Sequence, residues 1–213
     1  MKSSRRPALP DLVHWREEAL FGGEVTGAES AAGGAPGARG LVRIPRVLQF
    51  FDRLPFWRAY FESLGFEVAV TGPSLQRMIH AGVEAAVADP CFPVQMAHGH
   101  LLECAAGGEG IVFVPNVVNE EDPGKNPATY LCPWAQTLPL VALHTPAMGK
   151  IHDRILMPNI CFREGEDFVA SRLFEAMRPW RIGKKANRRA VRAAYEAQEA
   201  FKERQGEKGR VVL

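Results

Sequence analysis

The chain has 213 residues, of which 46% are hydrophobic and 23% are charged. These are the proportions of a globular protein, and they exclude global disorder. No apolar run reaches the roughly 18 residues that a membrane-spanning helix needs, and no secretory signal is visible. The formal net charge of +2 is too small to predict a nucleic-acid binder. We therefore expect a cytoplasmic protein whose four cysteines are reduced thiols.

The first 39 residues differ in composition from the remainder. The stretch from Gly22 to Gly40 is dominated by Gly, Ala, Glu and Ser, which bury little apolar surface when ordered. We interpret residues 1–39 as a flexible arm that makes few contacts with the sheet and contains a short helix around Leu12–Leu20. Residues 40–213 are expected to form one α/β domain with a C-terminal helix.

Beyond the arm, apolar runs with strand character alternate with stretches of helical periodicity. Strands are predicted over residues 42–48, 66–70, 111–118 and 155–162. Helices are predicted over residues 55–65, 74–81, 91–105 and 186–205, with Ser74 as the cap of the second. This alternation predicts an α/β fold with a mostly parallel sheet.

The end of the chain has two interpretations. Gly206 and Gly209 follow the last predicted helix, and the closing residues Arg210–Leu213 look like the start of a strand. These residues are either a short edge strand of the same sheet or the beginning of a second α/β half that is missing here.

The sequence lacks the glycine-rich motifs of nucleotide sites, the nucleophile elbow and any Cys-x-x-Cys pair. Chemistry is instead suggested by Cys91, which lies between two prolines at the expected start of a helix. The helix dipole there favours the thiolate, which is the metal-binding form. Gln95 and His98 follow on the same helix face, whereas Cys104 falls on the opposite side and is expected in the core.

Two further cysteines and a second histidine complete the candidate set. Cys132 is followed directly by proline, as at some iron–sulfur ligand positions. Cys161 ends a predicted strand, where α/β sheets assemble their sites. Buried cysteines that act only as small hydrophobes are an alternative, as is a zinc site made by Cys91, Cys132 and His98 or His100.

A basic run begins the last predicted helix. Lys184, Lys185, Arg188, Arg189 and Arg192 place five cations within nine residues, an arrangement that opposes the helix dipole. The run is either a solvated helix face or a docking site for an acidic partner or an acyl-CoA phosphate.

The segments RIPRVLQFFDRLPFWRAYFESLGFEVAVTGPS, DPCFPVQMAHGHLLE, IVFVPNVV and CPWAQ occur in this order. Together they resemble the uncharacterised domain found with 2-hydroxyacyl-CoA dehydratase activases. The resemblance covers about Val42–Leu213. That domain is similar in turn to the iron–sulfur subunits of 2-hydroxyacyl-CoA dehydratases.

The resemblance implies a Rossmann-like domain that holds a [4Fe-4S] cluster and takes part in ATP-driven low-potential electron transfer. Cys91 and Cys132 match the family's cysteine positions, and Cys161 is the expected third ligand. The implied partner is an ATP-dependent activase or a dehydratase subunit. No ATPase motif occurs here, and the family's second α/β half is also missing. A cluster that is normally enclosed between two halves would then be exposed, so we expect a partner or a second copy, in a homodimer, to cover it. A non-redox interaction module that docks on these proteins is the alternative.

The resemblance also suggests which polar side chains surround the cluster. Gln95 or His98 is expected to face the cluster because both share a helix face with Cys91, and His100 is a further candidate to lie around the ligands.

Overall fold

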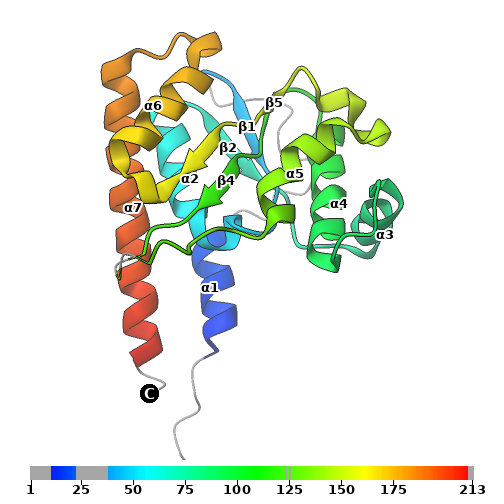
Figure 1. Ribbon diagram of the computed structural model, residues 1–213, viewed down its shortest axis with the longest axis horizontal. Coiled ribbons are helices and arrows are strands. Elements are labelled where there is room, and N and C mark those ends of the chain that lie inside the picture. The colour runs from blue at the N-terminus through cyan, green and yellow to red at the C-terminus, as the bar shows by residue number, and fades with distance from the viewer. Residues whose placement is uncertain (1–10, 23–37, 123, 125, 211–213) are drawn as a thin grey trace, which may run out of the picture.

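The computed structural model describes residues 11–22, 38–122, 124 and 126–210 (Figure 1). The strands are β1 (Leu41–Ile44), β2 (Glu67–Val70), β3 (Ile111–Phe113), β4 (Asn116–Asn119), β5 (Ile155–Leu156) and β6 (Asn159–Cys161). The α-helices are α1 (Leu12–Phe21), α2 (Phe50–Ser63), α3 (Gln76–Ala85), α4 (Phe92–Ala106), α5 (Pro133–Leu143), α6 (Glu166–Ala176) and α7 (Lys184–Arg210). Short 3-10 helices are η1 (Pro146–Ile151), η2 (Phe162–Glu164) and η3 (Arg178–Trp180).

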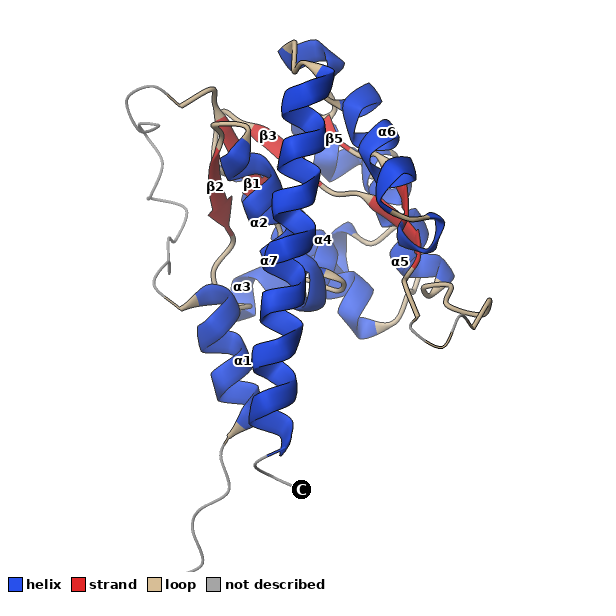
Figure 2. Cartoon of the chain, turned by 90° about the vertical axis from the view of Figure 1, so that its left-hand side faces the viewer, coloured by secondary structure: helices blue, strands red, loops and turns tan. Residues whose placement is uncertain are grey.

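The main sheet has four strands in the order β2-β1-β3-β5, and all of its paired strands are parallel. Val42 is the central residue of its register, with Val68 on one side and Ile111 on the other. Helices α2, α6 and α7 lie to one side of the sheet and α3, α4 and α5 to the other (Figures 1 and 2). The predicted α/β fold with a mostly parallel sheet is therefore confirmed.

Prolines shorten three of the predicted strands. The strand predicted over residues 42–48 ends at Ile44, before Pro45. The strands predicted over 111–118 and 155–162 are each divided, at Pro115 and Pro158 respectively, so that β4 and β6 form a separate parallel pair. A proline nitrogen cannot donate to the ladder, which explains the interruptions.

Three helix boundaries also differ from the prediction. Helix α2 begins at Phe50 and includes Pro55 in its second turn. Helix α3 begins at Gln76 without a side-chain cap, because the Ser74 hydroxyl contacts His100 instead. Helix α7 continues through both glycines to Arg210. Residues 211–213, which the sequence suggested as the start of a strand, lie outside the described residues.

Helix α1 packs against α2 and α7, although it belongs to the segment predicted as a flexible arm. The Phe21 ring meets Phe51 edge to face at 5.4 Å, and the Arg46 guanidinium lies 4.0 Å from the Phe21 ring centroid. Trp15 stacks on Phe201 of α7 at 6.1 Å. The predicted short helix is thus present and docked on neighbouring helices. Residues 23–37 of the predicted arm lie outside the described residues.

An aromatic cluster forms the core between the sheet and the helices α2 and α7. Its fully buried members include Phe50, Phe56, Trp57, Tyr60, Phe61, Phe113 and Phe162. A buried hydrogen bond lies within this cluster: the Tyr60 hydroxyl donates to Asn187 Oδ1 at 2.7 Å. Asn187 Nδ2 in turn donates to the Ala170 carbonyl at 2.8 Å, which joins α2, α6 and α7. No helix in the described ranges is long and apolar enough to cross a membrane.

Helices α3 and α4 approach each other closely enough for backbone atoms to touch. A Cβ atom placed on Gly99 would lie 2.0 Å from the Met78 carbonyl oxygen. One placed on Gly82 would lie 2.2 Å from the Gln95 carbonyl oxygen. Only glycine fits at both positions, so the two helices form a tightly packed pair that holds the start of α4 in place.

Candidate functional site

The N-termini of α4 and α5 present two exposed thiols in equivalent positions. Cys91 is the N-cap of α4 and Cys132 is the N-cap of α5, and each is followed by a proline in the first turn. Proline favours this position because its missing N–H would be unpaired there in any helix. Each sulfur therefore lies at the positive end of a helix dipole, where negative charge is stabilised. The predicted helix start at Cys91 is confirmed.

A glutamine four residues after each cysteine reaches back across the helix start. Gln95 Nε2 donates to Asp89 Oδ1 at 3.1 Å, and Gln136 Nε2 donates to the Leu131 carbonyl at 2.6 Å. Both side chains thus fasten the segment that precedes the cysteine. Gln136 was not among the residues predicted from the sequence, although the shared Cys-x3-Gln spacing of CFPVQ and CPWAQ is visible there.

The two cysteine-bearing helices contact each other on the same side of the sheet (Figure 1). An exposed aromatic side chain accompanies each thiol: Phe92 is 53% exposed and Trp134 is 37% exposed. Both thiols are exposed as well, so the site is open on this chain.

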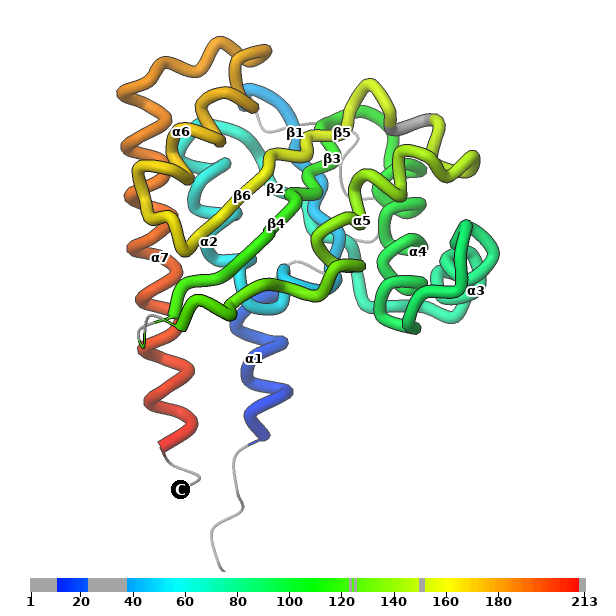
Figure 3. Tube along the Cα trace, in the orientation of Figure 1, coloured from blue at the N-terminus to red at the C-terminus, as the bar shows by residue number. Residues whose placement is uncertain are grey.

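Cys161 lies elsewhere in the fold. It ends β6, opposite Asn119 of β4, and this strand pair runs towards α6 and α7, whereas α4 stands beside α3 (Figure 3). Burial, followed by the nearby Glu164 carboxylate, raises the pKa of the Cys161 thiol. Within the part of the chain that the structure describes, no three His, Cys, Asp or Glu side chains are grouped to hold a metal ion. The fold thus brings Cys91 and Cys132 to adjacent helices but does not bring Cys161 into a group with them.

Cys104 is buried in α4, as expected. Burial raises the pKa of its thiol to about 12, so the group stays protonated. It has the role of a small core residue.

His100 fastens α4 to the loop that follows β2. Its Nδ1 lies 2.6 Å from Thr71 Oγ1 and its Nε2 lies 2.9 Å from Ser74 Oγ. Thr71 Oγ1 also accepts the Arg46 backbone N–H at 2.9 Å, which extends the link to the loop after β1. Burial, and then the nearby Arg46 charge, lower the pKa of His100 to about 4. With both ring nitrogens engaged, the residue positions two loops relative to α4.

His98 is buried and has one free ring nitrogen. Its Nδ1 donates to the Val94 carbonyl at 2.8 Å. Its Nε2 atom is inaccessible to solvent and has no hydrogen-bond partner among the described residues. Gln95, by contrast, is only partly buried. The sequence predicted that Gln95 and His98 share one helix face. That face is buried at His98 and partly exposed at Gln95.

A second polar cluster lies where the strand order reverses, between the carboxyl ends of β1 and β3. Leu48 adopts a left-handed backbone with φ 47°, and the next residue, Gln49, donates from Nε2 to the Pro115 carbonyl at 3.5 Å. Gln49 Oε1 and Asn116 Oδ1 are buried without a hydrogen-bond partner in the described chain. Such switch points are where α/β sheets bind ligands. No sequence motif marks this cluster, so it was not predictable from the residues alone.

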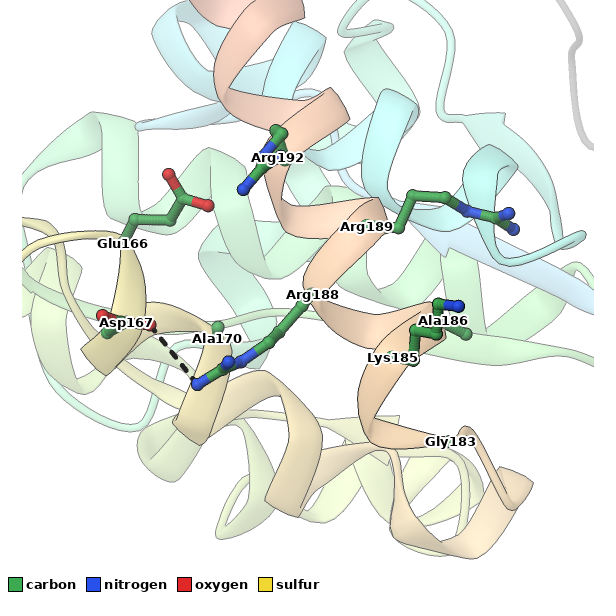
Figure 4. A pocket seen from close by; sticks show the side chains of 9 residues that line it. All are labelled: Glu166, Asp167, Ala170, Gly183, Lys185, Ala186, Arg188, Arg189 and Arg192. Atoms are coloured by element: carbon green, nitrogen blue, oxygen red, sulfur yellow. Dashed lines mark ion pairs between the residues drawn. The ribbon is translucent and has the colours of Figure 1, made fainter.

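Four members of the basic run, Lys185, Arg188, Arg189 and Arg192, line an open groove of about 800 Å³ between α6 and α7. Figure 4 shows Arg188 directed at Asp167, with an ion pair of 3.6 Å, whereas Arg189 extends away from α6. Glu166 and Asp167 form the acidic side of the groove. The groove therefore carries both charges, with cations in excess.

One family model matches the chain, over residues 42–213, and its description is CoA enzyme activase uncharacterised domain. Neither a curated protein nor a solved structure matches. The match spans nearly all of the folded domain and includes both Cys-x3-Gln elements. The chain therefore belongs to the family of the uncharacterised domain associated with CoA enzyme activases.

Proposed function

We propose that this protein is an iron–sulfur component of a 2-hydroxyacyl-CoA dehydratase and activase system, with a role in ATP-driven low-potential electron transfer. The observation that carries the proposal is the pair of Cys-x3-Gln helix starts, which present Cys91 and Cys132 on adjacent helices. Thiolates are the usual ligands of iron–sulfur clusters, and the donor chemistry of both residues fits a [4Fe-4S] group. Membership of a CoA enzyme activase family supports the same context.

The residues of this chain divide the work between holding and positioning. Cys91 and Cys132 would bind iron through sulfur, while Gln95 and Gln136 fix the segments that precede them. A bound cluster would supply one-electron chemistry. His100 stays neutral and keeps α4 in register with the sheet.

A complete site needs further ligands and a cover. Cys161 is the proposed third ligand, but its place at the end of β6 requires β6 or α4 to shift before it joins the other two. The exposed Phe92 and Trp134 favour cover by an activase, a dehydratase subunit or a second copy of this chain. Shielding from water would in turn set the potential of the cluster.

The test is anaerobic reconstitution with iron and sulfide, followed by metal and acid-labile sulfide analysis. We expect the wild-type protein and Cys104→Ala to retain iron and sulfide in equal amounts, because Cys104 is buried away from the site. Cys91→Ala and Cys132→Ala are each expected to lose most of both. Equal retention by all four proteins would refute the proposal.

Two other outcomes have a definite meaning. Zinc without sulfide would indicate the Cys and His site, although both ring nitrogens of His100 are already engaged. Protein that retains neither metal would instead favour a non-redox interaction module. The exposed apolar side chains on α3 to α5 are the observation that supports this second function, and they are Leu75, Val83, Phe92, Trp134 and Leu140.

A further inference from the structure

A surface patch that carries only positive charges covers η3 and the first half of α7. Its cations are Arg178, Arg181, Lys184, Lys185, Arg188, Arg189 and Arg192, and we name them the basic patch. No acidic residue occurs between residues 177 and 195. The whole chain has 26 cations and 24 acids, so the residues outside the patch hold 19 cations against 24 acids. The nearly neutral chain is therefore strongly polarised.

The side chains of the basic patch face solvent because the other face of α7 is buried. Asn187, Ala190 and Val191 pack inwards, whereas all seven cations are exposed. Among the residues described, Arg188 is the only patch member with an ion pair, to Asp167 at 3.6 Å. Several cations elsewhere in the fold have closer acidic partners, as Arg77 has with Glu103 at 2.9 Å.

The second half of α7 is an internal reference for an ordinary solvated face. There the exposed side chains alternate in sign, and Lys202 pairs with Glu199 at 2.7 Å and with Glu121 at 3.8 Å. A solvated helix face needs no single sign of charge, since like charges four residues apart destabilise a helix. Lys184 and Arg188 have this spacing, as do Lys185 and Arg189. Solubility alone therefore does not account for the patch.

The shape and charge of the surroundings favour one class of partner. The patch borders two connected hollows along α6, of about 800 Å³ and about 480 Å³, which share Asp167, Ala170 and Arg188. From Lys184 to Arg192 the patch extends about 12 Å along the helix, which is much longer than one phosphate group. Glu166 and Asp167 beside it oppose any anion, but a protein segment can place basic side chains next to these two carboxylates and acidic ones next to the cations, which a phosphate cluster cannot do.

We propose that the basic patch is a docking surface for an acidic segment of a protein partner. The groove between α6 and α7 receives that segment, and the unpaired cations neutralise its carboxylates. This surface lies on the α7 side of the sheet, while α4 and α5 lie on the other (Figures 1 and 2). The proposal is therefore independent of whether Cys91 and Cys132 bind a cluster.

The test measures binding of a dye-labelled peptide of alternating Glu and Ala, about twelve residues long, which is enough to span the patch. Fluorescence anisotropy at low and at physiological ionic strength gives the affinity. The patch variant combines the three charge reversals Lys185→Glu, Arg189→Glu and Arg192→Glu. Lys185 lies in the first turn of α7, where an acidic residue favours the helix dipole, and all three side chains are exposed, so circular dichroism should show an unchanged fold.

A matched control reverses the same number of charges at the far end of the same helix: Arg204→Glu, Lys208→Glu and Arg210→Glu. We expect the patch variant to bind the peptide about tenfold more weakly than wild type, and the control to bind within about twofold. Weakening by added salt is expected as well.

Three results would overturn the proposal. The first is a peptide that does not bind wild-type protein at low ionic strength. The second is an equal loss in both variants, which would reflect net charge alone. The third is tighter, patch-dependent binding of coenzyme A or of a short RNA than of the peptide, which would assign the surface to phosphate ligands instead.

Discussion

Acidification should destabilise the protein through His100. This histidine is buried and neutral in the fold, with its pKa lowered from 6.5 to about 4 mainly by burial. Below pH 6.5 the unfolded chain binds a proton at this position and the folded chain does not, so stability falls as the pH falls towards 4. The full difference corresponds to about 3 kcal/mol, and the part lost between pH 7 and pH 5 is about 2 kcal/mol.

The assay is urea unfolding at pH 7 and pH 5, with His100→Gln beside the wild type. Glutamine keeps a donor and an acceptor near Thr71 and Ser74 but does not titrate. We expect the variant to be less stable at pH 7 and to lose about 2 kcal/mol less than wild type on going to pH 5. His80→Gln, at an exposed position on the neighbouring helix α3, is the control and should follow the wild-type pH dependence.

The deciding quantity is the change in unfolding free energy between pH 7 and pH 5. Wild type and His100→Gln share all other titratable groups, so the difference between their changes reports on residue 100. If His100→Gln loses as much stability as wild type between the two pH values, the residue is not held neutral by the fold. The reasoning from its burial and its two hydroxyl partners would then be wrong.

Two further stability predictions use the same unfolding measurements. Gly99→Ala should cost about 2 kcal/mol, because its Cβ would lie 2.0 Å from the Met78 carbonyl oxygen, whereas Gly206→Ala in the exposed part of α7 should stabilise by about 0.5 to 1 kcal/mol. Similar effects of both changes would contradict the close approach of α3 and α4. Tyr60→Phe should cost about 1 to 3 kcal/mol because it leaves Asn187 Oδ1 buried without its donor, and a neutral result would show that this bond is replaceable.

The sequence predicted the alternation of strands and helices better than their ends. An apolar run identifies β3, whose three residues are all buried, because buried parallel strands need continuous hydrophobic side chains. In the edge strand β2, buried and half-buried residues alternate instead. Pro115 and Pro158, which divide two of the predicted strands, are visible in the sequence. Each has apolar residues on both sides, and the continuous apolar pattern predicted a single strand. Conversely, Gly206 suggested a helix end, yet a single glycine weakens a helix by only about 1 kcal/mol and α7 continues.

The candidate site was predictable where it depends on local structure. Proline beside Cys91 predicted the helix start, and the position of Cys104 on the opposite face predicted its burial. The role of His98 was not predictable, because spacing gives the face of a helix but not the element that covers it. Gln49 and Asn116 become candidate site residues only because they lie where the strand order reverses. That order depends on the whole chain and is not visible in the local sequence.

The length of α7 has a mechanical consequence. Its 27 residues form a rod of about 40 Å, which borders the groove in its first half and stacks Phe201 against Trp15 in its second half. Asn187 is bonded to Tyr60, and Gln198 donates to the Asp52 carbonyl at 2.8 Å, so that α7 is held to α2 at two points. A tilt of α7 at the groove would therefore also move the part of α7 that contacts α1, unless α7 slides along α2 or bends.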